Sequence, residues 1–131
     1  MTPSTTRHQV WYRVAAAACL AVTAYLHAEL YLGGYRAIPF IGPAFLLQAS
    51  AGFAVAVLLL FSDAAILRLG AAGVAAGALL GFVLSRTVGV AGFVERGLSP
   101  APEALLSLLS ELAALVLLTV PILAGARSSL R

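Results

Sequence analysis

Four long apolar segments take up almost the whole of this 131-residue chain, and the few polar residues lie near the ends of these segments. Hydrophobic residues make up 62% of the sequence and charged residues only 10%. A soluble domain of this length could not bury so much apolar surface, so we expect lipid around the segments. Each segment is long enough for a helix that crosses a bilayer core, which takes about 20 residues. The sequence therefore predicts an all-α fold, a transmembrane four-helix bundle that forms a single integral membrane domain.

Helix-start signals and polar links set the boundaries of these segments. An Ile-Gly-Pro sequence at residues 41–43 opens the second segment, and Pro102 with Glu103 opens the fourth, because proline and an acid suit the first turn of a helix. A turn at residues 62–63 joins the second segment to the third, so these two are antiparallel neighbours. The predicted spans are residues 11–31, 41–61, 64–85 and 103–126.

The basic residues predict the orientation of the bundle. The chain has eight arginines, no lysine and a net charge of +3. The arginines lie singly between apolar segments, which indicates contact with lipid head groups rather than with nucleic acid. If the N-terminus is cytoplasmic, most arginines lie on the cytoplasmic side, as the positive-inside rule requires. We therefore expect a multi-pass protein of the cell membrane with both termini in the cytoplasm. The arginines expected inside are Arg7, Arg13, Arg68, Arg127 and Arg131, and those expected outside are Arg36, Arg86 and Arg96.

Polar side chains inside the spans gather toward one side of the membrane. His27, Gln48 and Glu111 lie roughly 6, 9 and 12 Å inside the outer ends of their helices, from the rise per residue of a helix. Ser107 precedes Glu111 by one helical turn on the same face, and Arg86 ends the third span on the same side. The inner halves of the spans are almost purely apolar. These residues are the candidate ligand-binding set.

The carboxyl group of Glu111 leaves three interpretations open. An ionised carboxylate at this depth is costly unless it is paired or protonated. Arg86 is the expected partner, and such an ion pair would only fix the register of two helices. Alternatively, Glu111 belongs to a functional site, or it is protonated in lipid. His27 is either a hydrogen-bonded packing residue or a ligand-binding one, and we expect it to face inward while Glu29 faces water.

Three glycines of the third span predict close helix packing. Gly73, Gly77 and Gly81 are spaced by four residues and lie on one face. Small residues at this spacing let two helix backbones approach closely in a membrane. We expect the face to pack within the bundle, with a homodimer contact as the alternative. The two apolar, glycine-bearing links at residues 33–40 and 86–101 are expected to fold over the polar pocket.

The sequence contains no catalytic or metal-binding motif. A HExxH motif, a glycine-rich phosphate loop and a Ser-His-Asp constellation are absent, and no ligand spacing supports a metal site. The lone Cys19 excludes an internal disulfide and a multi-cysteine zinc site. No catalytic residue or metal ligand is therefore assigned, and the sequence indicates no particular cofactor.

A set of short segments carries a resemblance to known proteins. It consists of His27, Gly34-Tyr35-Arg36, Ile38-Pro39, Ile41-Gly42-Pro43, Phe45-Leu46-Leu47-Gln48 and Ser85-Arg86-Thr87-Val88-Gly89. Through these residues most of the chain resembles a group of small four-span membrane proteins of high-GC actinobacteria, and the overall plan is similar to that of DoxX-like four-helix proteins. The resemblance implies the four-span architecture and no reaction.

Three functional hypotheses follow. In the first, an outward-facing polar pocket binds a lipid, a quinone or another small ligand. In the second, the protein is an accessory or structural subunit that packs into a homo-oligomer or a larger membrane complex. In the third, a small membrane enzyme or proton-coupled transporter uses Glu111 and His27, although the apolar inner halves leave no continuous polar path across the membrane. The sequence favours the first two over the third, and it identifies neither ligand nor partner.

Overall fold

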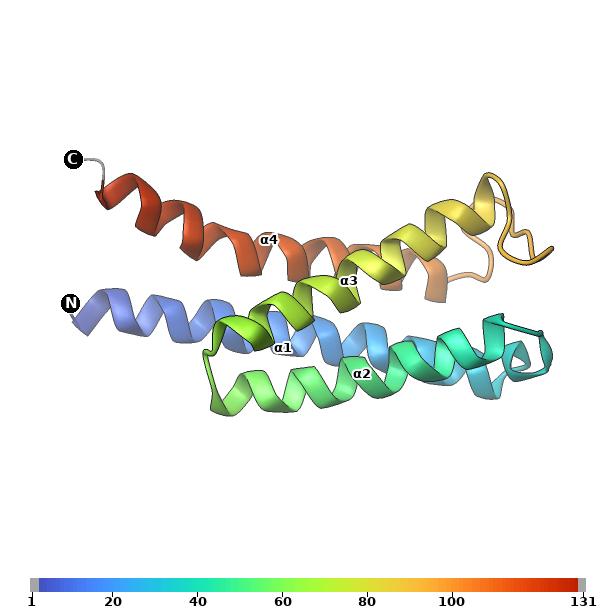
Figure 1. The fold of residues 1–131 in the computed structure, drawn as a ribbon, viewed down its shortest axis with the longest axis horizontal. Helices are drawn as coiled ribbons and strands as arrows, with labels where there is room; N and C mark the ends of the chain where they lie inside the picture. Colours follow the sequence, from blue (N-terminus) through green and yellow to red (C-terminus); the bar gives the residue numbers. More distant parts are fainter. Residues whose placement is uncertain (1–2, 130–131) are drawn as a thin grey trace.

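The computed structural model of the protein describes the backbone of residues 3–129 and the side chains of residues 7–124 and 126–127 (Figure 1). This part of the chain is built from four long helices and one short 3-10 helix between the first two. Four of these elements are long and apolar enough to cross a membrane, as in a multi-pass membrane protein. The elements are α1 (Pro3–Leu32), η1 (Tyr35–Ala37), α2 (Ile41–Phe61), α3 (Ala65–Arg86) and α4 (Glu103–Ser129).

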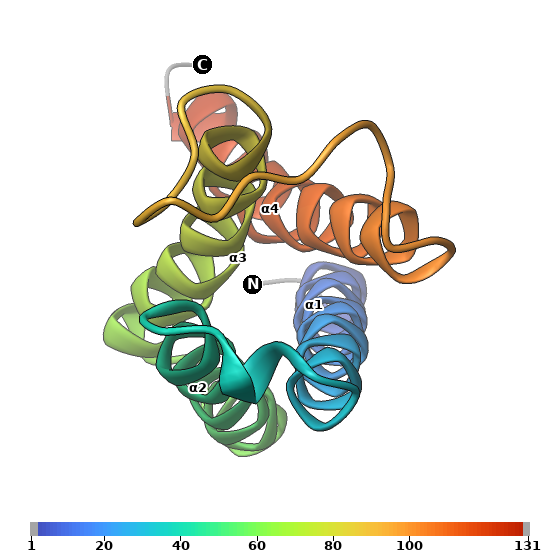
Figure 2. The same ribbon diagram turned by 90° about the vertical axis from the view of Figure 1, so that its right-hand side faces the viewer.

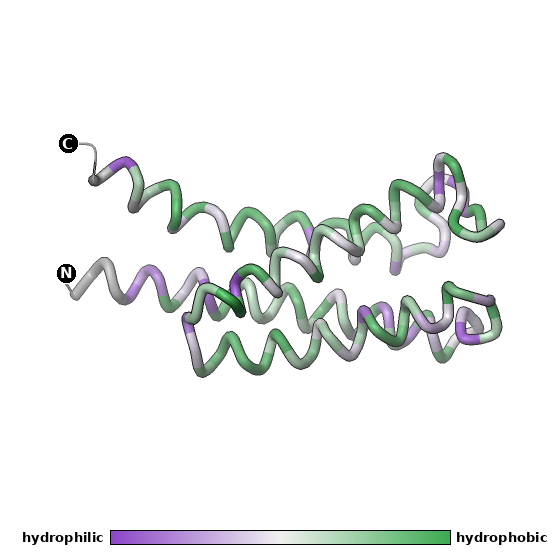
Figure 3. Tube along the Cα trace, viewed as in Figure 1, coloured by the Kyte–Doolittle hydropathy of each residue, from purple (hydrophilic) through white to green (hydrophobic). Residues whose placement is uncertain are grey.

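The helix boundaries agree closely with those expected from the sequence. α2 spans the predicted residues 41–61, and α3 and α4 begin within one residue of their predicted starts. α1 begins at Pro3, eight residues before the predicted start at residue 11. The prediction followed the apolar segment, whereas the helix also includes the polar residues before it. Figure 3 shows apolar residues along the middle of all four helices, with polar positions toward the two ends of the bundle.

Successive helices run antiparallel to one another, and both ends of the chain lie at the same end of the bundle (Figure 1). η1 and the link at residues 87–102 lie at the opposite end. α1 packs against α2 and α4, and α3 packs against the same two helices from the other side (Figure 2). α3 crosses the bundle obliquely, from the end of α2 toward the start of α4 (Figure 1). At the end of the bundle that carries η1, α2 and α3 therefore diverge.

Small residues form much of the core and allow the helices to approach closely. A close helix contact joins α1 and α2, where a Cβ atom placed on Gly52 would lie only 2.9 Å from the Cβ atom of Ala24. The remaining core is made mostly of alanine and leucine from all four helices. Its buried members are Ala16, Ala17, Leu20, Ala56, Leu59, Ala71, Ala75, Ala114 and Leu118.

The prediction that the glycine face of α3 packs within the bundle is wrong. Gly73, Gly77 and Gly81 are exposed, and no atom lies within 4 Å of the Cβ position of any of them. α3 instead buries Ala71 and Ala75, both of which are fully buried. The alanine stripe and the glycine stripe are offset by two residues, so they lie on roughly opposite faces of the helix. Both stripes consist of small residues, so the sequence alone did not show which of them packs within the bundle.

Candidate functional site

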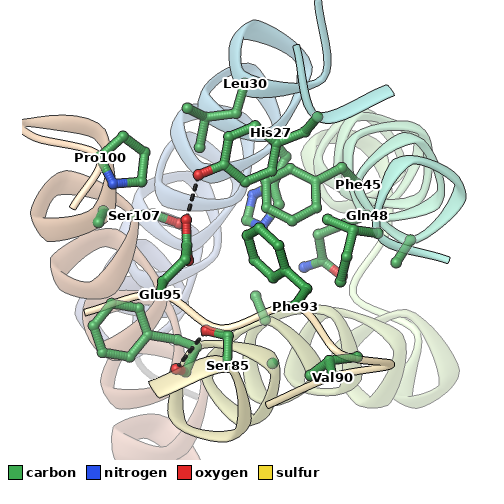
Figure 4. Close-up of a pocket in the computed structure, with 18 of the residues that line it drawn as sticks. His27, Leu30, Phe45, Gln48, Ser85, Val90, Phe93, Glu95, Pro100 and Ser107 are labelled. Carbon is green, nitrogen blue, oxygen red and sulfur yellow. Dashed lines mark hydrogen bonds between the residues drawn. The ribbon is translucent and has the colours of Figure 1, made fainter. Parts of the chain in front are cut away.

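A cavity of about 170 Å³ lies among the four helices at the end of the bundle that carries η1 (Figure 4). All four helices and both links contribute to its lining. The structure brings together on this one lining all the residues that the sequence predicted as a site. They are His27 of α1, Gln48 of α2, Arg86 of α3, and Ser107 and Glu111 of α4.

Glu111 lies on the floor of the cavity, and its side chain is almost fully buried, at 1% exposure. Its Oε1 atom accepts hydrogen bonds from the hydroxyl groups of Thr23, at 2.7 Å, and Ser107, at 2.5 Å. We call these three residues the Glu111 network. For Oε2, the described residues provide no hydrogen-bond partner. The network therefore holds the carboxyl group in place through one oxygen and leaves the other free.

Thr23 is a member of this network that the sequence analysis missed. It is completely buried on α1 and reaches α4 through its hydroxyl group. One signal could have identified it, because Thr23 precedes His27 by four residues and so lies on the same helix face, one turn deeper.

The predicted ion pair between Arg86 and Glu111 is wrong. The Arg86 guanidinium instead pairs with Glu95, with 3.0 Å between the nitrogen and the carboxylate oxygen. It also donates hydrogen bonds of 2.6 Å to the backbone carbonyls of Gly97 and Ser99. The link that follows α3 folds back over the end of the helix and supplies these acceptors from nearby in the chain. The guanidinium is thus turned toward the link instead of reaching down to Glu111.

Both links form a cover over the cavity, as the sequence predicted. Tyr35 of η1 donates a hydrogen bond to the Glu95 carboxylate, which joins the first link to the second. Burial and this hydrogen bond raise the pKa of the Tyr35 phenol above its ordinary value. The Tyr35 ring packs on Phe45, at 4.8 Å between centroids, and on Phe93, at 5.7 Å. The upper wall of the cavity is therefore aromatic.

The hydrogen bonds of His27 and Gln48 define which of their atoms are free. The Nδ1 atom of His27 lies 2.8 Å from the carbonyl oxygen of Thr23, and because a carbonyl only accepts, Nδ1 carries the proton. The amide nitrogen of Gln48 donates to the carbonyl oxygen of Val74 at 2.7 Å. The Nε2 atom of His27 and the Oε1 atom of Gln48 remain without hydrogen-bond partners among the described residues. Glu29 is exposed, as expected.

The cavity opens sideways between α2 and α3. Gly77 and Gly81 of α3 line the cavity and are exposed at the same time, and so is Ala44 of α2. The absence of side chains at the two glycines keeps this side of the cavity open. These glycines therefore shape the site, whereas the sequence pattern had indicated a packing role.

Within the described part of the chain, no group of three or more histidine, cysteine, aspartate or glutamate residues lies together as a metal site would require. Comparisons with protein-family models, with curated proteins and with solved structures found no match to the chain. The resemblance to small actinobacterial four-span proteins and to DoxX-like proteins therefore stays a prediction.

Proposed function

We propose that the protein binds a small amphiphilic molecule from the membrane in this cavity. The observation that carries the proposal is the convergence of polar atoms from three helices on the floor of a cavity whose upper wall is aromatic. The free oxygen of Glu111 and the free ring nitrogen of His27 belong to side chains that line it. A site of this kind, apolar with a few placed polar groups, is typical of small-molecule binding.

The size and the position of the cavity support a small ligand that enters from the bilayer. Its volume of about 170 Å³ resembles that of an engineered cavity of about 150 Å³ that accepts a benzene ring. The opening between α2 and α3 lies within the length of the apolar helices, where lipid would surround the bundle. A ligand dissolved in the bilayer would therefore reach the floor without crossing the cover formed by the two links.

We further propose that the protein lies in the cell membrane with both termini in the cytoplasm. The arrangement of the helices supports a location of both termini on the same side of the membrane, because both ends of the chain lie at one end of the bundle (Figure 1). The excess of arginines on that side supports its cytoplasmic location. The cavity would then face the outer half of the membrane.

A second candidate function, that of an accessory subunit, is favoured by one observation. Gly73, Gly77 and Gly81 leave an open face on α3, and a helix of another chain could approach such a face closely. Because Gly77 and Gly81 also border the opening of the cavity, a partner helix on this face would cover that opening, so this role is an alternative to ligand entry from the bilayer.

Occlusion of the side opening tests the binding function. We expect 2-phenylethanol, a neutral amphiphile of suitable size, to give saturation-transfer NMR signals with the protein in nanodiscs, above an empty-nanodisc blank. Gly77→Leu should abolish the signals, because the new side chain would occupy the opening. Gly73→Leu is the matched control, since Gly73 is equally open but does not line the cavity, and it should bind as the wild type does. Equal binding by both variants would contradict the proposed site.

A further inference from the structure

Three side-chain atoms on the lining of the cavity are acceptors without a hydrogen-bond partner among the described residues. They are the Oε2 atom of Glu111 when its carboxyl group is ionised, the Nε2 atom of His27, whose Nδ1 atom carries the proton, and the Oε1 atom of Gln48. Each is left over after the other polar atom of the same side chain has bonded to the protein. These acceptors are therefore available to the donors of a ligand in the cavity.

Every donor group on the same lining already makes at least one hydrogen bond within the protein. Ser107 donates to Glu111, Ser85 donates to the carbonyl of Phe82 at 3.0 Å, and Tyr35 donates to Glu95. The Arg86 guanidinium donates to Glu95, to Gly97 and Ser99, and to the Ser85 hydroxyl at 2.8 Å. A ligand that offers only acceptors, such as a phosphate or a carboxylate, would compete with these bonds for donors.

The charged side chains of the lining favour the same kind of ligand as the free acceptors do. Arg86, Glu95 and Glu111 are the charged side chains that line the cavity. The first two neutralise each other in an ion pair, in which both side chains are largely buried. Glu111 has no cationic partner among the described residues, so its ionised form would be uncompensated. A cation would compensate it, whereas an anion would meet a buried carboxylate.

Aromatic rings complete the surroundings that a cation requires. Phe45, Phe93 and Tyr35 are in ring contact above the floor, and His27 contacts Phe45 with 5.0 Å between ring centroids. The face of an aromatic ring attracts a nearby ammonium group and also packs against apolar carbon atoms. The aromatic wall of the cavity can therefore attract the ammonium group of an amine and also pack against its apolar body.

We infer that the ligand of this cavity is a protonated amine with a small apolar body. Its ammonium group donates hydrogen bonds to Glu111 Oε2, with His27 Nε2 and Gln48 Oε1 as further acceptors, while its body packs on the aromatic wall. This inference rests on the proposed function and adds the chemical class of the ligand. Ammonium groups carry only donors, which matches the acceptors that the protein leaves free.

Four probes of nearly the same shape and different head groups test the inference. They are 2-phenylethylamine, 2-phenylethanol, phenylacetate and ethylbenzene, each titrated at neutral pH into protein in nanodiscs of zwitterionic lipid, with empty nanodiscs as the blank. We expect the amine to bind about ten- to a hundredfold more tightly than the alcohol, the gain typical of a charged hydrogen bond. Phenylacetate should bind more weakly than ethylbenzene.

Substitution of the carboxyl groups provides the second arm. Glu111→Gln should remove the advantage of the amine over the alcohol, while the amide oxygen can still accept from Thr23 and Ser107. Glu29→Gln is the matched control, because Glu29 is exposed on α1 outside the cavity, and it should leave the advantage intact.

The outcomes separate the two proposals. If no probe binds, the proposed function fails and the inference fails with it. If the alcohol or the anion binds as tightly as the amine, the cavity is a binding site but the amine inference is overturned. The ranking of the four probes on the wild type decides this even if Glu111→Gln does not fold.

Discussion

The Arg86 guanidinium lies 3.0 Å from the carboxylate of Glu95, nine residues further along the chain, and not against Glu111 within the bundle. Arg86 also lies over the ring of Phe82, at 3.7 Å from the ring centroid. Because Glu95 accepts a hydrogen bond from Tyr35 as well, one ion pair connects the end of α3 to both links. This connection holds the cover in place above the cavity.

We expect a double-mutant cycle to reveal this pair. Arg86→Gln or Glu95→Gln alone should lower the free energy of unfolding by about 1.5–3 kcal/mol, since each leaves a largely buried charge without its partner. The double variant should recover part of this loss. A parallel cycle between Arg86 and Glu111 should give a coupling energy near zero, and strong coupling there would contradict the observed pairing. Thermal unfolding in nanodiscs provides the measurement.

Removal of the Thr23 hydroxyl tests the Glu111 network. Thr23→Val keeps the shape of the side chain and removes a donor to a buried carboxyl group, so the free energy of unfolding should fall by about 1–3 kcal/mol. Thr119→Val is the control, because its hydroxyl bonds only to carbonyls of its own helix on an exposed face, and it should change stability little. A similar loss in both variants would argue against a special role for Thr23.

The contact between α1 and α2 depends on the absence of a side chain at Gly52. Gly52→Leu should destabilise the protein by about 1–3 kcal/mol, as overpacking of a core does, because even a Cβ atom there would crowd Ala24. The same substitution at Gly73 introduces a side chain into open space and should leave stability almost unchanged. Unfolding midpoints of the two variants in detergent compare these effects, and equal losses would contradict the observed packing.

Cysteine labelling tests the proposed orientation. In a Cys19→Ala background, cysteines at Ser4 or Ser129 should react with a membrane-impermeant reagent only after the cytoplasmic side is opened. Cysteines at Ala37 or Ser99 should react in intact cells, because both positions lie in exposed parts of the links. The reverse pattern would place the cavity in the inner half of the membrane and overturn the positive-inside assignment.

Local properties of the chain were sufficient to predict the helices and five of the polar residues that line the cavity. The apolar runs and the helix-start residues predicted α2 at 41–61, because a helix depends on residues within a few turns of one another. Helical periodicity also placed Ser107 with Glu111 on one face, and His27 but not Glu29 toward the interior. Such relations are already present in a single helix.

The pairings between helices and links were decided only by the tertiary structure. The partner of Arg86 depends on how residues 87–102 fold back, and the contact of Thr23 with Glu111 depends on how α1 lies against α4. The open position of Gly77 follows from the oblique crossing of α3 and from the burial of its alanine stripe. Several arrangements satisfy the same local pattern, and the packing of all four helices together selects among them, since every helix must bury one face at the same time.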